Sequence, residues 1–243
     1  MKTPLPFRVM SKVAALSLAA AFSLPAAAQS AGDNIVNVGW FHLYTDDSSE
    51  PLRQTFPTPG TNAGSGASVG SADTLGIAFT HFFTDNFAVA LDAGIPPEFK
   101  LKGEGTLASR GQLGTAKQWS PAIVAKWYFG GANDKWRPFV GLGVTHVWYT
   151  SVQLSSSMQA LAAPVPGGTA SAELSSSWAP VANVGVTYNF NKNWSLGMSL
   201  SYIPLDTDAY ITGKTAGGTV ISRSQTNLTL DPYVTFISLG YKF

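Results

Sequence analysis

Tyr233-Val-Thr-Phe-Ile-Ser-Leu-Gly-Tyr-Lys-Phe243 ends the chain, and its residues alternate between two kinds. Counting back from Phe243, every second position as far as Ile237 is aromatic or aliphatic, with Lys, Gly and Ser between them. The period of two covers about ten residues, the length that a tilted strand needs to cross a bilayer. A soluble chain rarely ends on such a strand, whereas an outer-membrane β-barrel closes its wall with one. The segment makes a transmembrane barrel the first hypothesis for the fold.

The opposite end of the chain has the three parts of a secretory signal peptide. Basic residues precede an apolar run at residues 13–24, and Pro25-Ala-Ala-Ala28 supplies a small-residue cleavage site. A membrane anchor is the alternative, but the run is short for a spanning helix. We therefore predict that residues 1–28 are a signal peptide and that residues 29–243 form a single barrel domain.

Composition narrows the class of protein further. Removal of residues 1–28 lowers the number of basic residues from 15 to 12 against 14 acidic ones, a net charge of −2. This balance argues against a nucleic-acid partner, and the absence of cysteine excludes disulfides and thiolate-bound metal. No run of 18 apolar residues follows residue 28, so no transmembrane helix is expected. A soluble β-sandwich and a membrane β-barrel remain.

Eight segments alternate between apolar and small or polar residues. They are residues 36–44, 75–80, 87–94, 122–129, 139–148, 181–190, 194–202 and 233–243. Their connections alternate in length, with short turns at 84–86, 130–136 and 191–193 and long loops near 46–72, 95–118, 150–177 and 204–229. Bacterial barrels have an even number of strands, short periplasmic turns and long extracellular loops. A sandwich has no reason to sort its connections in this way.

Aromatic residues gather at both ends of these segments, where the two membrane interfaces would lie. The periplasmic set is Phe87, Phe129, Trp136, Phe190, Trp194, Tyr241 and Phe243, and the outer set is Tyr44, Trp119, Trp148, Trp178, Tyr202 and Tyr233. Within 194–202, strand parity directs Met198 to lipid and Ser199 to the lumen. The sequence therefore predicts an all-β fold, an eight-stranded antiparallel transmembrane β-barrel in the bacterial outer membrane.

Six pieces of sequence fall, in order, on the expected strands and turns: Leu75-Gly-Ile-Ala-Phe-Thr80, Thr84-Asp-Asn86, Ala125-Lys-Trp-Tyr-Phe-Gly130, Arg137-Pro-Phe-Val-Gly-Leu-Gly143, Asn193-Trp-Ser-Leu-Gly-Met-Ser199 and Leu230-Asp-Pro-Tyr233. As a set they resemble the OmpW/AlkL family of outer-membrane proteins over nearly the whole mature chain. The loops at 46–72 and 150–177 match no motif of that family. The resemblance implies a barrel that passes small hydrophobic molecules across the outer membrane, with the choice of solute made in the loops.

The interior of an eight-stranded barrel is only wide enough for side chains or one small ligand. The residues expected to face it are mostly small or apolar, with too few charges for a large ionic network. We predict that a channel or ligand site is lined by Phe41, Leu43, Val124, Phe139, Trp178, Val181 and Phe236. The alternative is that these side chains fill the interior and plug it.

Prolines fall in the outer parts of several expected strands. Because proline has no N–H for the ladder, it is unusual within a closed sheet and weakens the wall. A gap there would let an apolar solute leave sideways into lipid. The candidates for this lateral opening are Pro96, Pro97, Pro121 and Pro180. Strand termination is the simpler explanation for prolines that stand at strand ends.

Catalysis and metal binding have little support in the sequence. The three histidines point outward by strand parity, and no serine stands in a nucleophile motif. We predict no catalytic residue, metal or cofactor. The predicted function is a passive channel for small hydrophobic molecules, with lateral release and with outer-membrane lipid, lipopolysaccharide and those solutes as partners. The alternative is a structural or adhesive barrel without transport activity.

Overall fold

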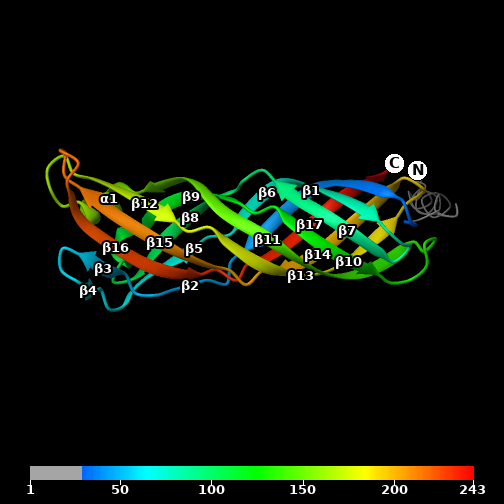
Figure 1. Cartoon of the computed structure of the whole chain (residues 1–243), viewed down its shortest axis with the longest axis horizontal. Coiled ribbons are helices and arrows are strands. Elements are labelled where there is room, and N and C mark those ends of the chain that lie inside the picture. The colour runs from blue at the N-terminus through cyan, green and yellow to red at the C-terminus, as the bar shows by residue number, and fades with distance from the viewer. Residues whose placement is uncertain (1–28) are drawn as a thin grey trace, which may run out of the picture.

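Eight long antiparallel strands close into a barrel in the computed structural model, which describes residues 29–243 (Figure 1). They are β1 (Asn34–Tyr44), β6 (Ala72–Phe82), β7 (Phe87–Gly94), β10 (Ala122–Tyr128), β11 (Trp136–Leu154), β13 (Ser177–Asn189), β14 (Trp194–Tyr202) and β17 (Tyr233–Lys242). Each pairs with the next barrel strand in the chain, and β17 pairs with β1 to close the ring. The predicted fold class is confirmed. The predicted signal peptide at residues 1–28 lies outside the described residues.

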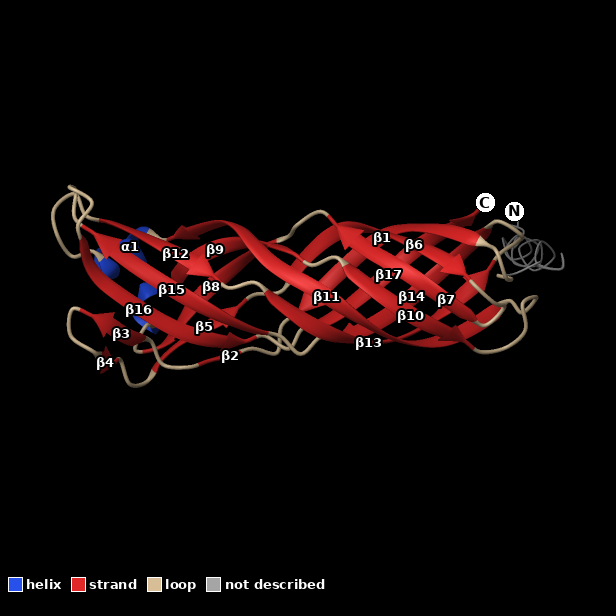
Figure 2. Cartoon of the chain, in the orientation of Figure 1, coloured by secondary structure: helices blue, strands red, loops and turns tan. Residues whose placement is uncertain are grey.

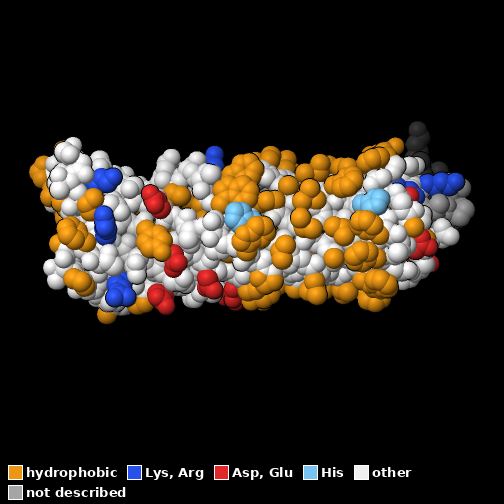
Figure 3. Space-filling model, viewed as in Figure 1, with side chains coloured by type: hydrophobic (Ala, Val, Ile, Leu, Met, Phe, Trp, Pro, Cys, Tyr) orange, Lys and Arg blue, Asp and Glu red, His pale blue; other side chains and the backbone are white. Residues whose placement is uncertain are grey.

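The side chains of the barrel strands alternate between the outer wall and the lumen, because successive residues of a strand point to opposite faces. In β14, Leu196, Met198 and Leu200 are exposed on the outer wall, whereas Ser195 is buried inside. Figure 3 shows hydrophobic side chains gathered over the barrel half of the molecule, whereas charged side chains are spread over the other half and appear again at the end of the barrel that carries the chain termini. The predicted orientation of this strand is confirmed.

The four long connections are not irregular loops, because most of their residues form further strands beyond the barrel (Figure 2). Beside the outer part of β11, the barrel sheet continues through β9 (Gln112–Trp119), β8 (Glu98–Gly105) and β5 (Ser65–Val69). A second sheet contains β12 (Thr169–Leu174), β15 (Asp206–Lys214), β16 (Val220–Thr229), β3 (Arg53–Phe56) and β4 (Gly60–Thr61), with β2 (Ser48–Ser49) paired to β16. The expectation of long loops is therefore corrected to an ordered extension of the barrel.

This outer half has its own apolar core, which explains why it is ordered. One cluster of buried residues centres on Val147, Leu205 and Leu228, and another contains Met158 and Ile211. Two short helices, η1 (Ala108–Arg110) and α1 (Ser156–Ala162), complete this half. Among residues 29–243, no helix has the length and apolar character that a membrane span requires. The apolar interior of the molecule thus continues outward from the barrel.

Candidate functional site

A cavity of about 270 Å³ lies in the lumen at the outer end of the barrel, and we call it the main cavity. Its wall is mostly apolar and includes Phe41, Leu43 and Val181, three of the residues predicted to line a channel. Five non-aromatic polar side chains interrupt this wall: Thr74, Asp92, Gln118, Ser120 and Ser201. A wall of this kind suits an apolar ligand that carries few polar groups.

Three further cavities, which we call the outer passage, connect the tip of the molecule to the main cavity through shared lining residues. The tip cavity, of about 380 Å³, shares Leu52 and Met158 with an apolar cavity of about 70 Å³. The latter shares Leu101 and Leu228 with a cavity of about 20 Å³, which in turn shares Gln118 with the main cavity. The cavity of about 20 Å³ has room for only about one water molecule. Side chains must therefore move before a larger solute can pass this point.

A pair of stacked phenylalanines forms the floor of the main cavity. The ring centroids of Phe41 and Phe236 lie 4.0 Å apart with their planes 11° from parallel. The ring of Phe41 covers Gly76, where any Cβ atom would come within 2.0 Å of it. Glycine at this position is what lets the ring lie against the wall. Phe236, predicted to line the channel, is buried behind Phe41.

Below the floor, the periplasmic half of the lumen is filled, and we call this filling the plug. Its apolar part consists of Ile35, Phe82, Ala88, Tyr128 and Phe139. Arg137 is fully buried against it, with its guanidinium carbon 5.8 and 5.2 Å from the ring centroids of Phe82 and Tyr128. Phe139 was predicted to line a channel and instead belongs to the plug. Val124 packs against Ala122 and Val181 between the two regions.

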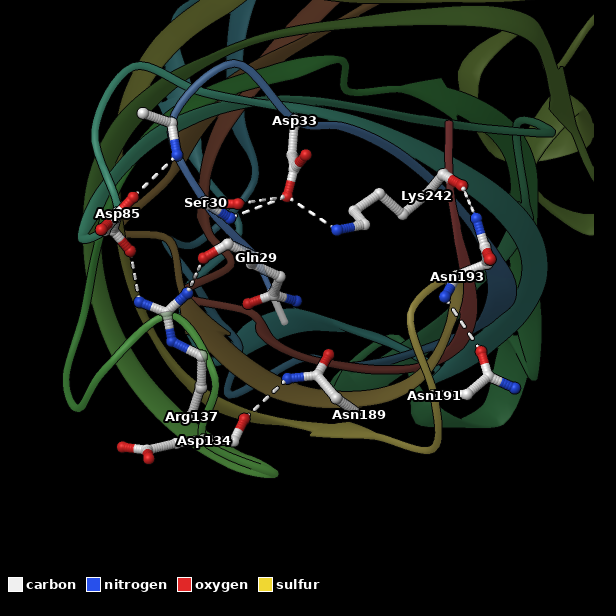
Figure 4. A network of polar contacts seen from close by, with 11 residues as sticks. Gln29, Ser30, Asp33, Asp85, Asp134, Arg137, Asn189, Asn191, Asn193 and Lys242 are labelled. Carbon is white, nitrogen blue, oxygen red and sulfur yellow. Dashed lines mark hydrogen bonds and ion pairs between the residues drawn. The ribbon is translucent and has the colours of Figure 1, made fainter. Parts of the chain in front are cut away.

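Polar contacts tie the plug to the periplasmic rim (Figure 4). Arg137 donates to the carbonyl oxygen of Gln29 at 2.7 Å and to that of Asp85. Lys242 forms an ion pair with Asp33 at 3.0 Å between Nζ and Oδ2. The plug expected as an alternative therefore occupies one half of the barrel, and the cavity occupies the other.

The wall beside the main cavity is open between β7 and β10, and we call this opening the seam, formed by residues 93–96 and 119–121. The last pair of these strands is Asp92 with Ala122, and the next bond across joins the Gln118 N–H to the Pro97 carbonyl at 3.1 Å. Alternation along each strand directs the backbone groups of Gly94 and Ser120 into the seam. Pro96, two positions after Gly94, also has its backbone directed toward the seam, but proline has no N–H that could form a hydrogen bond across it.

Both edges of the seam remain bonded to the strands behind them. The Ile95 N–H donates to the Leu75 carbonyl of β6 at 3.0 Å. The Pro121 carbonyl accepts from the Thr145 hydroxyl at 2.9 Å and from the His146 N–H at 3.3 Å, both on β11. The gap is therefore a local property of one strand pair and not a general loosening of the wall.

The main cavity reaches the lipid face of the barrel through this seam. Ile95 is 63% exposed and Trp119 is 38% exposed, yet both also line the main cavity. The rings of Trp119 and Trp148 stack at 5.8 Å with planes 2° from parallel. An indole pair thus forms one edge of the opening, at the level where the outer aromatic girdle was expected.

Two predicted site residues lie elsewhere. Trp178 is 73% exposed on the outer wall, with its ring 4.7 Å from that of His146, because parity turns it away from the lumen-facing Val181. Pro180 also points outward, and β13 stays paired with β11 on both sides of it. Neither residue lines the main cavity or the seam. Of the four prolines predicted to form a lateral opening, three lie together at the seam: Pro96, Pro97 and Pro121.

The sequence analysis did not single out Ile95, Gln118 and Trp119 as cavity residues. Each of the three lies within three positions of a proline that the sequence analysis proposed for the lateral opening. Their closeness to these prolines is the feature of the sequence that could have identified them. The three histidines lie apart on the outer wall, and none lines the main cavity. His42, for example, contacts Asp73 at 2.8 Å between Nδ1 and Oδ1.

Comparison with known proteins gives consistent matches. A family model described as the OmpW family matches residues 30–243. Outer membrane protein W of Escherichia coli (strain K12) is 32% identical over 232 residues, which are 95% of this chain and 98% of that protein. Outer membrane protein AlkL of Ectopseudomonas oleovorans is 29% identical over 75% of this chain and 74% of that protein. The crystal structure of the outer membrane protein OprG from Pseudomonas aeruginosa superimposes with a TM-score of 0.78 at 29% identity, covering 90% of this chain and 99% of that one.

Proposed function

Because this chain belongs to the OmpW family and resides in the outer membrane like its relatives, we propose that it is a passive channel for small hydrophobic molecules. A solute enters the outer passage, reaches the main cavity and leaves through the seam into the outer leaflet of the membrane. The proposal goes beyond the family membership, which establishes an outer-membrane barrel of the OmpW/AlkL type.

The observation that carries the proposal is a cavity closed below and open at its side. The plug blocks the way to the periplasm, and the seam connects the same cavity to the lipid face. An apolar solute gains free energy when it moves from water into an apolar environment. Release into lipid therefore keeps the solute out of water throughout its path, whereas release into the periplasm would not.

The physical benefit lies in crossing the outer layer of the membrane. The polar, charged sugar layer of lipopolysaccharide is a poor solvent for an apolar molecule. The outer passage bypasses that layer with walls of Leu, Ala and Met side chains. Transport needs no energy source, because the solute only moves down its own gradient.

Flux into proteoliposomes tests the proposal. The protein is expected to accelerate uptake of an apolar solute over protein-free liposomes. Val181→Asp, which places a second carboxyl group in the main cavity, is expected to lower that flux at least about tenfold, because an apolar solute that passes must strip water from this group and offers it no partner. Val181→Thr has nearly the same shape without charge and is the matched control.

Folding of each variant is checked by the heat-dependent gel mobility of the barrel. Uptake no faster than in protein-free liposomes would remove the transport proposal and leave a structural or adhesive barrel. Wild-type flux in a folded Val181→Asp barrel would show that solutes do not pass the main cavity.

A further inference from the structure

Two polar side chains of the main cavity form no side-chain hydrogen bond with any residue from 29 to 243. Oδ1 of Asp92 is buried without a hydrogen bond. Within residues 29–243, the ion pairs are those of His42 with Asp73 and of Lys242 with Asp33, so Asp92 has no salt-bridge partner there. Gln118 is 6% exposed, and no hydrogen bond joins its side-chain amide to another described residue.

Such groups are unusual, because buried polar atoms in folded proteins nearly always have hydrogen-bond partners. The buried cation that faces Asp92 is Lys126, and its Nζ lies instead 5.1 Å from the ring centroid of Phe139, over the plug. The protein therefore leaves Asp92 available to whatever occupies the cavity. A polar group of a solute can therefore form the hydrogen bond that Asp92 lacks within the protein.

The two groups lie at different levels of the cavity. Gln118 lines both the main cavity and the narrow cavity of the outer passage, so it marks the entrance. Asp92 pairs with Ala122 directly below the seam, so it marks the lower end. Ala122 is four positions after Gln118, which corresponds to at most about 13 Å of extended chain. Apolar side chains such as Leu205 form the wall between them.

We infer that the main cavity selects amphipathic solutes, which have an apolar body and one hydrogen-bond donor, a hydroxyl or an amine, that bonds to Asp92. The inference rests on the proposed function and specifies its class of solute. Scaling from a 150 Å³ cavity that holds benzene, the body has roughly ten non-hydrogen atoms. A hydrocarbon of this size offers no hydrogen-bond donor and leaves the carboxyl group unpaired, which lowers the affinity of the hydrocarbon.

Methyl NMR of the full mature barrel in lipid nanodiscs tests this selection. Leu43 and Leu205 are buried and line the main cavity, so their methyl shifts report its occupancy. The probes are 1-octanol and nonane, which have equal numbers of non-hydrogen atoms, with concentrations expressed per lipid to correct for partitioning. Octanol is expected to saturate the shifts at about one tenth of the nonane concentration, a difference of about 1.4 kcal/mol.

Variants test whether the preference for octanol over nonane depends on the side chain of Asp92. Asp92→Leu is expected to abolish it, and Asp92→Asn, which keeps a carbonyl acceptor, is expected to retain part of it. Asp73→Leu makes the same change beside the cavity residue Thr74, but on a side chain that is exposed on the outer wall, and is expected to leave the preference intact.

The outcomes separate this inference from the proposed function. Equal saturation of the wild-type barrel by both probes overturns the inference, and so does a preference that survives Asp92→Leu. If both probes also enter proteoliposomes at equal, accelerated rates, the channel stands and only the selection is wrong. If neither probe shifts the methyls and neither shows accelerated uptake, the channel itself is wrong.

Discussion

One step along a barrel strand decides whether a side chain meets lipid or lumen. Met198 is 55% exposed on the outer wall, and the side chain of its neighbour Ser199 faces inward. The sequence predicts this direction well, because the face of a strand that contacts lipid must be apolar, whereas the face toward the lumen can be polar or apolar.

The cost of a charge on the lipid face follows from this orientation. Met198→Arg is expected to lower the free energy of unfolding in lipid vesicles by about 2–4 kcal/mol if it lies near the bilayer midplane. Met198→Leu, which keeps the apolar volume, is expected to change it by less than about 1.5 kcal/mol. Denaturant titration followed by tryptophan fluorescence measures both. An arginine variant as stable as the leucine variant would show that the register is shifted by one residue.

Direction and height along the barrel each explain one of the two corrected lining residues. Trp178 stands three positions before Val181, so the two cannot share a face of a strand, and the structure places Trp178 outside. Phe139 does face inward, as predicted, but its height along the barrel places it in the plug. Parity gives direction from sequence alone, whereas function depends also on which residues surround the side chain.

At the level of elements, the seam depends on the course of two strands. β7 stays with β6 as far as Ile95, and β10 stays with β11 from Ala122 onward. Beyond Asp92 and Ala122 the two strands no longer pair, and Pro96 has no N–H with which to continue the ladder. The wall therefore opens without loss of the bonds that hold its edges.

Amide hydrogen exchange reports on the seam directly. The Ile95 amide, bonded to the Leu75 carbonyl, is expected to be protected, and so is the Ala122 amide beside it. The Gly94 and Ser120 amides are expected to exchange at least about a hundredfold faster, because no backbone hydrogen bond holds them across the seam and both residues line the main cavity. NMR of the barrel in nanodiscs measures each amide separately. Protection of Gly94 and Ser120 equal to that of Ile95 would mean that the strands pair there and that the wall is closed.

The sequence predicted the eight barrel strands and missed most strands of the outer half. β8 carries a short alternation, with Phe99 and Leu101 between charged residues, but β16 has polar residues on both of its faces. Away from the membrane, both faces of a strand can be polar, so the period of two weakens. The outer strands are specified by the core that they enclose, which a single segment does not reveal.

At the scale of the whole molecule, the two halves of the barrel are filled differently. The plug occupies the periplasmic half of the lumen, and the main cavity lies in the outer half. The plug joins distant parts of the chain, since Arg137 bonds to Gln29 across 108 residues. Contacts of this separation leave no trace in local periodicity, and for this reason the sequence left cavity and plug as alternatives for the whole lumen.

The most direct test of the account is to bridge the seam and measure flux. The chain has no cysteine, so Gly94→Cys with Ser120→Cys provides a unique pair that a short, reducible bis-thiosulfonate can join. With the bridge in place, uptake of an apolar solute into proteoliposomes is expected to fall to the protein-free level and to recover on reduction, while each single-cysteine variant with the same reagent stays active. Undiminished uptake through a barrel whose bridge is verified by mass spectrometry would contradict lateral release.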